Sequence, residues 1–278
     1  MFKKLFAVVA IVFAMCGTVV PSALADNSIP ISIYVNEKEI CTDQSAYIKN
    51  GTTFVPIRAI CNAMGVNNVE WDNVRKKVTV RGYSKVEFYI GEKYAYVNGE
   101  KKNMPRVAEL KNGRTMVPVR FFAEASDAVV EWDNILHSVK ISKKGVNVPV
   151  KYRANEYSSD DVLWLSRIVE AESAGEPIKG QIAVANVVLN RVKDTNYPNT
   201  IPAVIFDRNY GVQFQPVANG TIYNTPSKKC VSAAKRAVNG ENYAGRCLYF
   251  LNEKIATNMW IVNNRDYYTT INNHSFYL

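Results

Sequence analysis

Histidine is nearly absent from this sequence, which contains only His137 and His274. The chain also has no HExxH, CxxC or GxSxG motif. A catalytic zinc ion is normally held by several His, Cys or carboxylate ligands at close spacing, and many Ser-His-Asp hydrolases carry their serine in a GxSxG turn. We therefore expect no metal and no cofactor, and we look for the chemistry among carboxylates.

Long runs of charge of one sign are also missing. The chain has 34 Lys and Arg against 25 Asp and Glu, a formal net charge of +9 that is spread along the sequence. There is no basic stripe and no nucleic-acid-binding motif, so we expect no nucleic-acid partner. A mildly basic exported protein would be attracted to an anionic cell wall, although ordinary solubility explains the same charge.

An extended apolar run occurs only at the N-terminus. Lys3 and Lys4 precede apolar residues 5–15, and Ala23-Leu24-Ala25 forms a small-x-small cleavage pattern. This arrangement predicts a secretory signal peptide over residues 1–25. The alternative is an uncleaved membrane anchor, but the run is shorter than the roughly 20 residues of a membrane span, which favours cleavage. We expect a secreted protein with no membrane contact after cleavage.

Cysteine is sparse after residue 25. Four cysteines allow three disulfide connectivities, and export permits disulfides without requiring them. If the chain divides into two domains, the pairings within each domain are Cys41–Cys61 and Cys230–Cys247. Four free, buried thiols are the alternative.

Residues 30–142 contain an internal repeat. GTTFVPIRAI from Gly51 and VEWDN from Val69 recur as GRTMVPVRFF from Gly113 and VEWDN from Val130. Each copy predicts a strand, a helix that begins at the VP proline, a strand through the tryptophan, an Asp-Asn turn and a further strand. The expected unit is a small α+β module, with helices over Ile57–Met64 and Val119–Ala125.

Two residue types recur at matching positions of the repeat. Trp71 and Trp132 could stack on sugar rings or fill the core beside each helix. Arg58 and Arg120 could contact a ligand or form an internal ion pair. The sequence leaves both alternatives open.

The VPxR and WDN elements of residues 30–142 resemble the copper amine oxidase N-terminal-like, or stalk, domain family. The resemblance implies a binding or spacer module for the cell envelope. Copper itself is not expected, because His137 is the one histidine of the segment and no ligand cluster accompanies it. Residues 143–157 contain Gly, Pro and charge without a clear period and are expected to form a linker.

The segment Ser158-Ser159-Asp160-Asp161 is a strong N-cap signal and predicts a helix from about Asp160 to Ala174, which Gly175 ends. Its apolar positions recur at helical spacing, and the same face continues to Glu172. Desolvation and the C-terminal end of the helix dipole would both raise the pKa of that carboxyl, as a general acid near neutral pH requires. The alternative is a surface glutamate at a frayed helix end.

Further helices are predicted over Ile178–Val192, as the buried central helix, and over Ser227–Val238, with one helical turn over Ile201–Phe206. Asn186 and Asn190 share one face of the central helix. They could line a cleft or form internal hydrogen bonds.

Residues from about 163 to 278 resemble the SleB-type cell wall hydrolase family, which includes spore cortex-lytic enzymes. The matching segments are LSRIVEAESAGEP from Leu165, QIAVANVVLNRV from Gln181, VQF from Val212, LYFLN from Leu248 and NNHSFY from Asn272. The resemblance implies a compact, lysozyme-like, mainly helical fold and cleavage between muramic acid and N-acetylglucosamine. It places the catalytic glutamate at Glu172 and recurrent cleft positions at Gln213, Phe214, Tyr249, Asn252 and His274.

The expected architecture has two domains after the signal peptide: the duplicated α+β stalk module over residues 30–142, then a mainly α, lysozyme-like catalytic domain over residues 158–278. The other acids of the second domain show no recognisable pattern near Glu172, whereas a two-carboxylate glycosidase needs a second acid. A lone glutamate favours a lytic transglycosylase that forms a 1,6-anhydro product.

Peptidoglycan is the expected partner, in the cell wall or spore envelope, and spore cortex lysis during germination is the setting that the resemblance implies. The alternatives are a muramidase or glucosaminidase that uses water, a non-catalytic wall-binding protein, and an amidase or peptidase acting on the stem peptides. The last would have to use Cys230 or Cys247 with His274.

Overall fold

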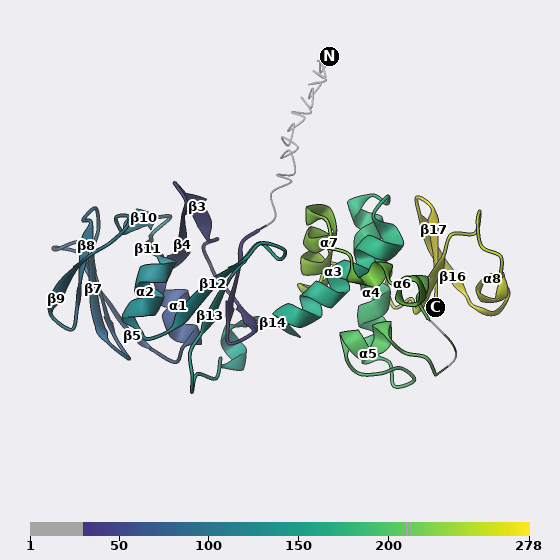
Figure 1. The fold of residues 1–278 in the computed structure, drawn as a ribbon, viewed down its shortest axis with the longest axis horizontal. Coiled ribbons are helices and arrows are strands. Elements are labelled where there is room, and N and C mark those ends of the chain that lie inside the picture. The colour runs from purple at the N-terminus through teal and green to yellow at the C-terminus, as the bar shows by residue number, and fades with distance from the viewer. Residues whose placement is uncertain (1–29, 210, 212) are drawn as a thin grey trace, which may run out of the picture.

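The computed structural model describes residues 30–209, 211 and 213–278, so the expected signal peptide lies outside the described residues. The chain forms two domains that lie side by side (Figure 1). The first is rich in strands and the second contains the long helices. Among the helices described, none is both long enough and apolar enough to cross a membrane.

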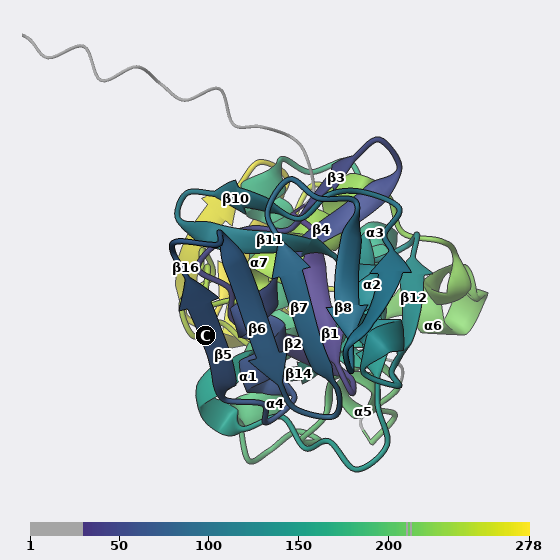
Figure 2. The same cartoon turned by 90° about the vertical axis from the view of Figure 1, so that its left-hand side faces the viewer.

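Three sheets build the N-terminal domain. In spatial order, the first contains β12 (Val129–Asp133), β13 (Ser138–Ser142), β1 (Ser32–Val35), β2 (Lys38–Ile40) and β14 (Arg153–Ser158). The second contains β5 (Asn68–Asp72), β6 (Lys77–Arg81), β7 (Lys85–Tyr89), β8 (Tyr94–Val97) and β9 (Glu100–Asn103), and Figure 2 looks onto its strands. The third contains β10 (Glu109–Lys111), β11 (Arg114–Pro118), β4 (Thr52–Pro56) and β3 (Tyr47–Lys49).

Two short helices lie between these sheets, α1 (Ile57–Ala63) and α2 (Val119–Ala125). Pro56 and Pro118 are their N-cap residues, so each helix begins at the VP proline as the sequence predicts. The element order β4, α1, β5, β6 recurs as β11, α2, β12, β13.

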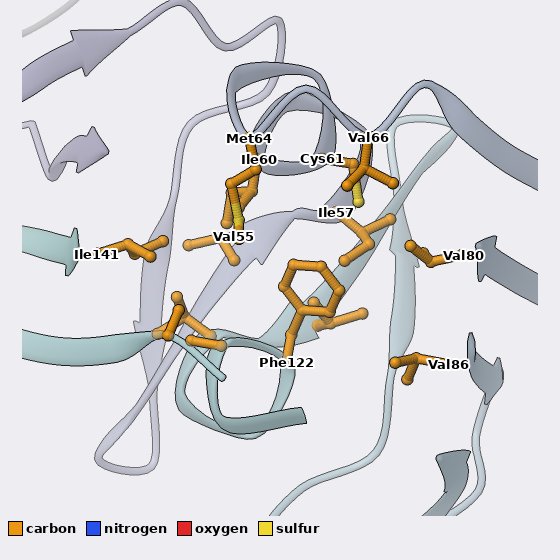
Figure 3. Close-up of a cluster of buried hydrophobic side chains, with 14 of the residues drawn as sticks. Val55, Ile57, Ile60, Cys61, Met64, Val66, Val80, Val86, Phe122 and Ile141 are labelled. Carbon is orange, nitrogen blue, oxygen red and sulfur yellow. The ribbon is translucent and has the colours of Figure 1, made fainter. Parts of the chain in front are cut away.

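The core of this domain lies where the two helices meet the sheets (Figure 3). The ring of Phe122 from α2 lies near Ile57 of α1 and near Val80 and Val86 of the second sheet. Phe122 and Ile57 are each 2% exposed. Full burial of such a side chain is worth about 1.5–3 kcal/mol, so these contacts hold the sheets and helices together.

Residues 143–157, expected as a linker, belong to the first domain. They include a 3₁₀ turn, η1 (Val150–Tyr152), and most of β14, which pairs antiparallel with β2. β14 is an edge strand, and a strand that pairs on one side can be polar along most of its length. This explains why the segment lacks the apolar alternation by which strands are recognised.

The C-terminal domain begins directly after β14. Its helices are α3 (Ser159–Ser173), α4 (Ile178–Lys193), α5 (Ile201–Ile205), α6 (Gln215–Asn219), α7 (Lys228–Val238) and α8 (Trp260–Asn264), with a 3₁₀ turn η2 (Thr221–Tyr223). Its one sheet among the described residues has the order β15 (Tyr249–Leu251), β17 (His274–Tyr277), β16 (Tyr267–Ile271). The predicted helices are present, whereas this sheet was not predicted.

Local signals explain the first two helices. The Ser158 side chain accepts a hydrogen bond from the Asp161 backbone, and the Asp161 side chain accepts one from the Ser158 backbone, which forms a capping box. α4 is buried on several faces, as its continuous apolar sequence predicts. Asn186 and Asn190 form internal hydrogen bonds, to residues 241–247, and line neither of the two grooves described below.

The two domains share buried contacts. Leu136, from the turn between β12 and β13, is fully buried and belongs to the hydrophobic core of the C-terminal domain. Lys235 of α7 is 4% exposed and donates hydrogen bonds to the backbone oxygens of Pro30 and His137. Ser159 donates a hydrogen bond to the Glu37 carboxylate. These contacts fix the orientation of one domain on the other.

Candidate active site

Glu172 lies in the last turn of α3, on the face that continues the buried residues Leu165, Ile168 and Val169. Its half-buried carboxyl lines a groove of about 630 Å³. The floor and walls come from the end of α3, the turn into α4, β15 and the loop that follows it. The alternative of a solvent-exposed glutamate at a frayed helix end is therefore not what the structure shows.

The surroundings of Glu172 favour its protonated form. Burial raises the pKa of this carboxyl to about 7, and the positive charge of Arg191 opposes the shift only in part. A carboxyl with a pKa near 7 is protonated in a large fraction of molecules at neutral pH and still able to release its proton. Glu172 thus has the acid strength that general acid catalysis requires.

Arg191 was not singled out from the sequence. It lies in the last turn of α4, is 6% exposed, and donates from Nε to the Leu248 carbonyl at 2.8 Å. Its guanidinium lies 5.2 Å from the ring centres of Tyr197 and Phe214 and 5.7 Å from that of Tyr249. The signal that could have revealed it is its position on the buried face of α4, four and three residues after Val187 and Val188, where a charge needs a partner.

The expectation of a lone carboxylate does not hold, because Glu170 and Glu176 line the same groove as Glu172. Glu170 accepts hydrogen bonds from the backbone N–H and the hydroxyl of Ser227, at 2.8 and 2.6 Å. Although burial raises the pKa of Glu170, these bonds hold it below its ordinary value. Glu170 therefore caps the start of α7 as an anion, and Ser227 occupies its carboxylate.

Glu176 is 4% exposed and is also held as an anion. Burial raises its pKa, but hydrogen bonds from Asn273 and Asn272 outweigh that effect and lower it overall. The Asn273 side chain donates to Oε1 at 3.0 Å, and His274 Nδ1 lies 3.9 Å from the same oxygen. The groove thus contains two glutamates in different environments: that of Glu172 favours the protonated form, and that of Glu176 favours the ionised form.

The spacing of residues in the sequence did not predict an ionised Glu176 beside Glu172. The residues that hydrogen-bond to Glu176 come from the opposite end of the domain. Asn273 and His274 belong to the β16–β17 hairpin, which the sequence did not predict. Gly180 permits the close approach of Glu176 to α4, since a Cβ at position 180 would lie 3.1 Å from the Glu176 Cβ.

Of the five expected cleft residues, the structure brings Asn252 and His274 to the groove beside Glu172. Gln213 and Tyr249 are half-buried elsewhere, and the Tyr249 hydroxyl accepts a hydrogen bond from Arg265. Phe214 is 3% exposed and lies in the core under Arg191. A side chain buried to this extent is not accessible to a ligand, so the structure does not support a direct contact between Phe214 and substrate.

The four cysteines in the described part of the chain are unpaired. Cys230 and Cys247 are fully buried, and burial raises their pKa values to about 12 and about 11. A nucleophilic cysteine needs an accessible thiolate, so this pair does not suit a cysteine peptidase or amidase. Cys41 is exposed and Cys61 is buried.

Metal donors are not gathered within the residues that the structure describes: no three His, Cys, Asp or Glu side chains lie close enough to hold an ion. His137 packs edge-on against Trp132, with ring centres 5.0 Å apart, and lies beside Lys235. This environment does not fit copper, which prefers several nitrogen or sulfur ligands.

Family models match both domains. The copper amine oxidase N-terminal domain matches residues 34–141, and the cell wall hydrolase family matches residues 175–277. The second match begins three residues after Glu172, so Glu172 itself lies just outside it.

Among curated proteins, the chain is similar to a spore cortex-lytic enzyme of Bacillus cereus, at 43% identity over 118 residues, which cover 42% of each chain. A spore cortex-lytic enzyme of Bacillus subtilis strain 168 is 35% identical over 41% of this chain and 40% of its own length. The chain thus spans about two fifths of the length of these relatives. Among solved structures, the catalytic domain of the germination-specific lytic transglycosylase SleB from Bacillus anthracis is 40% identical, covering 45% of this chain and 98% of that one, with a TM-score of 0.41.

Proposed function

Since the C-terminal domain of this chain belongs to the cell wall hydrolase family, we propose that it cleaves the glycan strands of peptidoglycan, with Glu172 as the catalytic acid. The observation that carries the proposal is the half-buried carboxyl of Glu172 in a groove, with a pKa raised to about 7. A glycosidic bond breaks when its oxygen receives a proton, and a desolvated glutamate is suited to supply it.

The proposed reaction joins muramic acid C1 to its own C6 oxygen. Glu172 donates its proton to the glycosidic oxygen, and the bond between that oxygen and muramic acid C1 breaks, which leaves positive charge on C1. The Glu172 carboxylate then accepts the proton of the C6 hydroxyl, whose oxygen bonds to C1. The products are a free 4-hydroxyl on N-acetylglucosamine and a 1,6-anhydro muramic acid, with no water consumed.

Arg191 suits this cycle as a positioning residue. Its positive charge lowers the pKa of Glu172 and therefore stabilises the anion that exists between the two proton transfers. The guanidinium is held by the Leu248 carbonyl and by aromatic rings, so its place does not depend on a substrate.

Glu176 favours a second candidate, hydrolysis by water. An ionised carboxylate in the groove could activate a water molecule against C1, as in two-carboxylate glycosidases. The oxygens of Glu176 are engaged by Asn273, and the side chain is 4% exposed, so we favour a positioning role in which Glu176 holds the β16–β17 hairpin at the groove.

Digestion of purified peptidoglycan followed by mass spectrometry tests both candidates. We expect 1,6-anhydro muramic acid ends from the wild type and no new ends from Glu172→Gln. Asp160→Asn, the same change of carboxyl to amide at the exposed start of α3, is the matched control and should cut normally. Reducing ends without anhydro sugars would establish hydrolysis, and unaltered cutting by Glu172→Gln would remove Glu172 from the mechanism.

We further infer that the protein is exported by the segment over residues 1–25 and acts in the cell wall or spore envelope. The repeated segments over residues 30–142 are interpreted as two copies of one α+β unit, and the second domain as a lysozyme-like fold. Assays on spore cortex and on vegetative wall in parallel, with the same enzyme concentration, identify the form of peptidoglycan that is cut.

A further inference from the structure

A second groove, of about 770 Å³, lies on the N-terminal domain. Trp71 of β5 and Arg58 of α1 line it, together with Asn62, Asn73, Lys76 and Arg114. Its volume is in the range of small-ligand sites, and its lining combines an aromatic ring with hydrogen-bonding and cationic groups. No residue of the C-terminal domain takes part in it.

The two repeat tryptophans have different environments. Trp132 packs against the hydrophobic core, and its indole Nε1 donates to Asn134 Oδ1 at 2.8 Å. Trp71 is 37% exposed, lines the groove, and has no acceptor for its indole N–H within the described part of the chain. Trp132 thus packs against the core with its donor satisfied, whereas Trp71 exposes part of its ring and keeps a free donor.

The turn after each tryptophan also differs. In the second repeat, Leu136 of this turn is buried in the C-terminal domain, and the His137 carbonyl accepts from Lys235. In the first repeat, the corresponding turn is open to solvent, with Val74 92% exposed. This turn of the second copy is therefore covered by the C-terminal domain, whereas the same turn of the first copy, beside Trp71, is open.

The groove is positively charged. Arg58 and Lys76 form no ion pair with any carboxylate among residues 30–209, 211 and 213–278. Asp43 also lines the groove and pairs with Arg114 at 2.5 Å, so those two charges offset each other and leave Arg58 and Lys76 as the net charge of the lining. The internal ion pair that could have explained Arg58 from the sequence is therefore not formed, and its guanidinium stays available for an anion.

We propose that this groove binds a sugar residue that carries a carboxylate, with the ring stacked on Trp71 and the carboxylate paired with Arg58 and Lys76. An aromatic face packs against the C–H face of a sugar ring, and guanidinium groups bind carboxylates through paired hydrogen bonds. Muramic acid has this chemistry, because its lactyl carboxylate is free where no stem peptide is attached, and where a stem peptide is attached that peptide supplies carboxylates of its own. The inference goes beyond the proposed cleavage, because the groove holds no catalytic residue, but it rests on the proposed function for the choice of peptidoglycan as the source.

Nuclear magnetic resonance of the full mature chain carrying Glu172→Gln tests the proposal without cleavage. The chain has four tryptophans, so the Trp71 indole N–H signal is identified as the one lost in Trp71→Phe. We expect this signal to shift saturably when N-acetylglucosaminyl-N-acetylmuramic acid is added. Arg58→Gln should raise the dissociation constant measured from this signal about tenfold, which corresponds to a loss of about 1.4 kcal/mol of binding free energy.

Arg120→Gln is the matched control, because Arg120 is exposed at the same position of the second repeat and lies outside the groove. It should leave the dissociation constant unchanged. The proposal is overturned if the Trp71 signal does not move, if the neutral N-acetylglucosamine dimer moves it with equal affinity, or if Arg120→Gln weakens binding as much as Arg58→Gln.

A second measurement separates this site from the active site. In the otherwise wild-type chain, Trp71→Ala should reduce retention on insoluble peptidoglycan several-fold and leave the turnover of soluble glycan strands unchanged. Loss of turnover on soluble strands would instead show that Trp71 serves the catalytic domain and would contradict the proposal. Cleavage by the wild type is scored independently, so failure of the proposed function is recognised without reference to Trp71.

Discussion

Replacing Glu172 by glutamine should stabilise the protein at neutral pH while it removes activity. Burial raises the pKa of Glu172 from 4.5 to about 7, so the folded protein resists an ionisation that the unfolded chain undergoes freely. At about 1.36 kcal/mol per pH unit, the difference between these pKa values corresponds to about 3 kcal/mol. Glutamine has nearly the same shape and cannot ionise, so it avoids this destabilisation.

The sign of the effect follows from proton binding. Between pH 4.5 and 7 the folded state of the wild type binds more protons at this site than the unfolded state, so its stability falls as pH rises through that window. The stability advantage of Glu172→Gln should therefore be near zero at pH 4, grow up to pH 7, and stay constant above it.

Chemical denaturation of the full chain at pH 4, 6 and 8 measures this advantage, with Asp160→Asn as the control for a lost carboxylate on the same helix. Asp160 is exposed, so its variant should show no such pH dependence. An advantage of Glu172→Gln that is the same at pH 4 and pH 8 would refute the reasoning, because it would show that desolvation of the carboxylate is not what shifts the pKa.

Three further outcomes are expected. Cleavage by the wild type should fall about tenfold per pH unit above pH 7, as the pH–rate profile measures, because Glu172 must carry a proton to act as an acid. Arg191→Met should move that alkaline limb to higher pH, since Arg191 lowers the pKa of Glu172; an unmoved limb would separate the two residues. Burial lowers the pKa of Lys235 from 10.5 to about 8, so between these two pH values the unfolded chain binds more protons at this site than the folded protein. The stability of the protein, measured by thermal unfolding, should therefore rise from pH 8 to 10. Lys235→Met should abolish this rise, and a rise of equal size in the variant would assign it to another group.

The helices were predictable because their signals are local. Ser158 and Asp161 form the capping box that starts α3, and the apolar period of α3 continues to Glu172. The VP prolines mark the starts of α1 and α2 in the same way. A short-range pattern was sufficient to place the proposed acid on its buried helix face.

The remainder of the site depends on contacts between distant segments. Glu176 is held by Asn273, 97 positions later in the sequence, through a hairpin whose strands mix polar and aromatic residues. Arg191 is buried because of rings that come from three other segments, among them Phe214 and Tyr249. Neither contact follows a periodic pattern of residues along the chain, so neither was predicted from the sequence.

The repeat explains how one chain could combine a wall anchor with a cutting site. The second copy contributes Leu136 to the core of the C-terminal domain, and Lys235 closes the same contact, so the two domains form one buried junction. The first copy keeps the matching surface open around Trp71. A junction of this kind allows little independent rotation of the domains, so a glycan strand bound at Trp71 would reach the Glu172 groove from one direction.

Leu136→Ala removes a fully buried side chain and should lower the stability of the junction by about 2–5 kcal/mol. We therefore expect it to loosen the junction and to reduce cutting of insoluble wall more than cutting of soluble strands. Equal reduction on both substrates would mean that the orientation of the domains is irrelevant to how the wall is attacked.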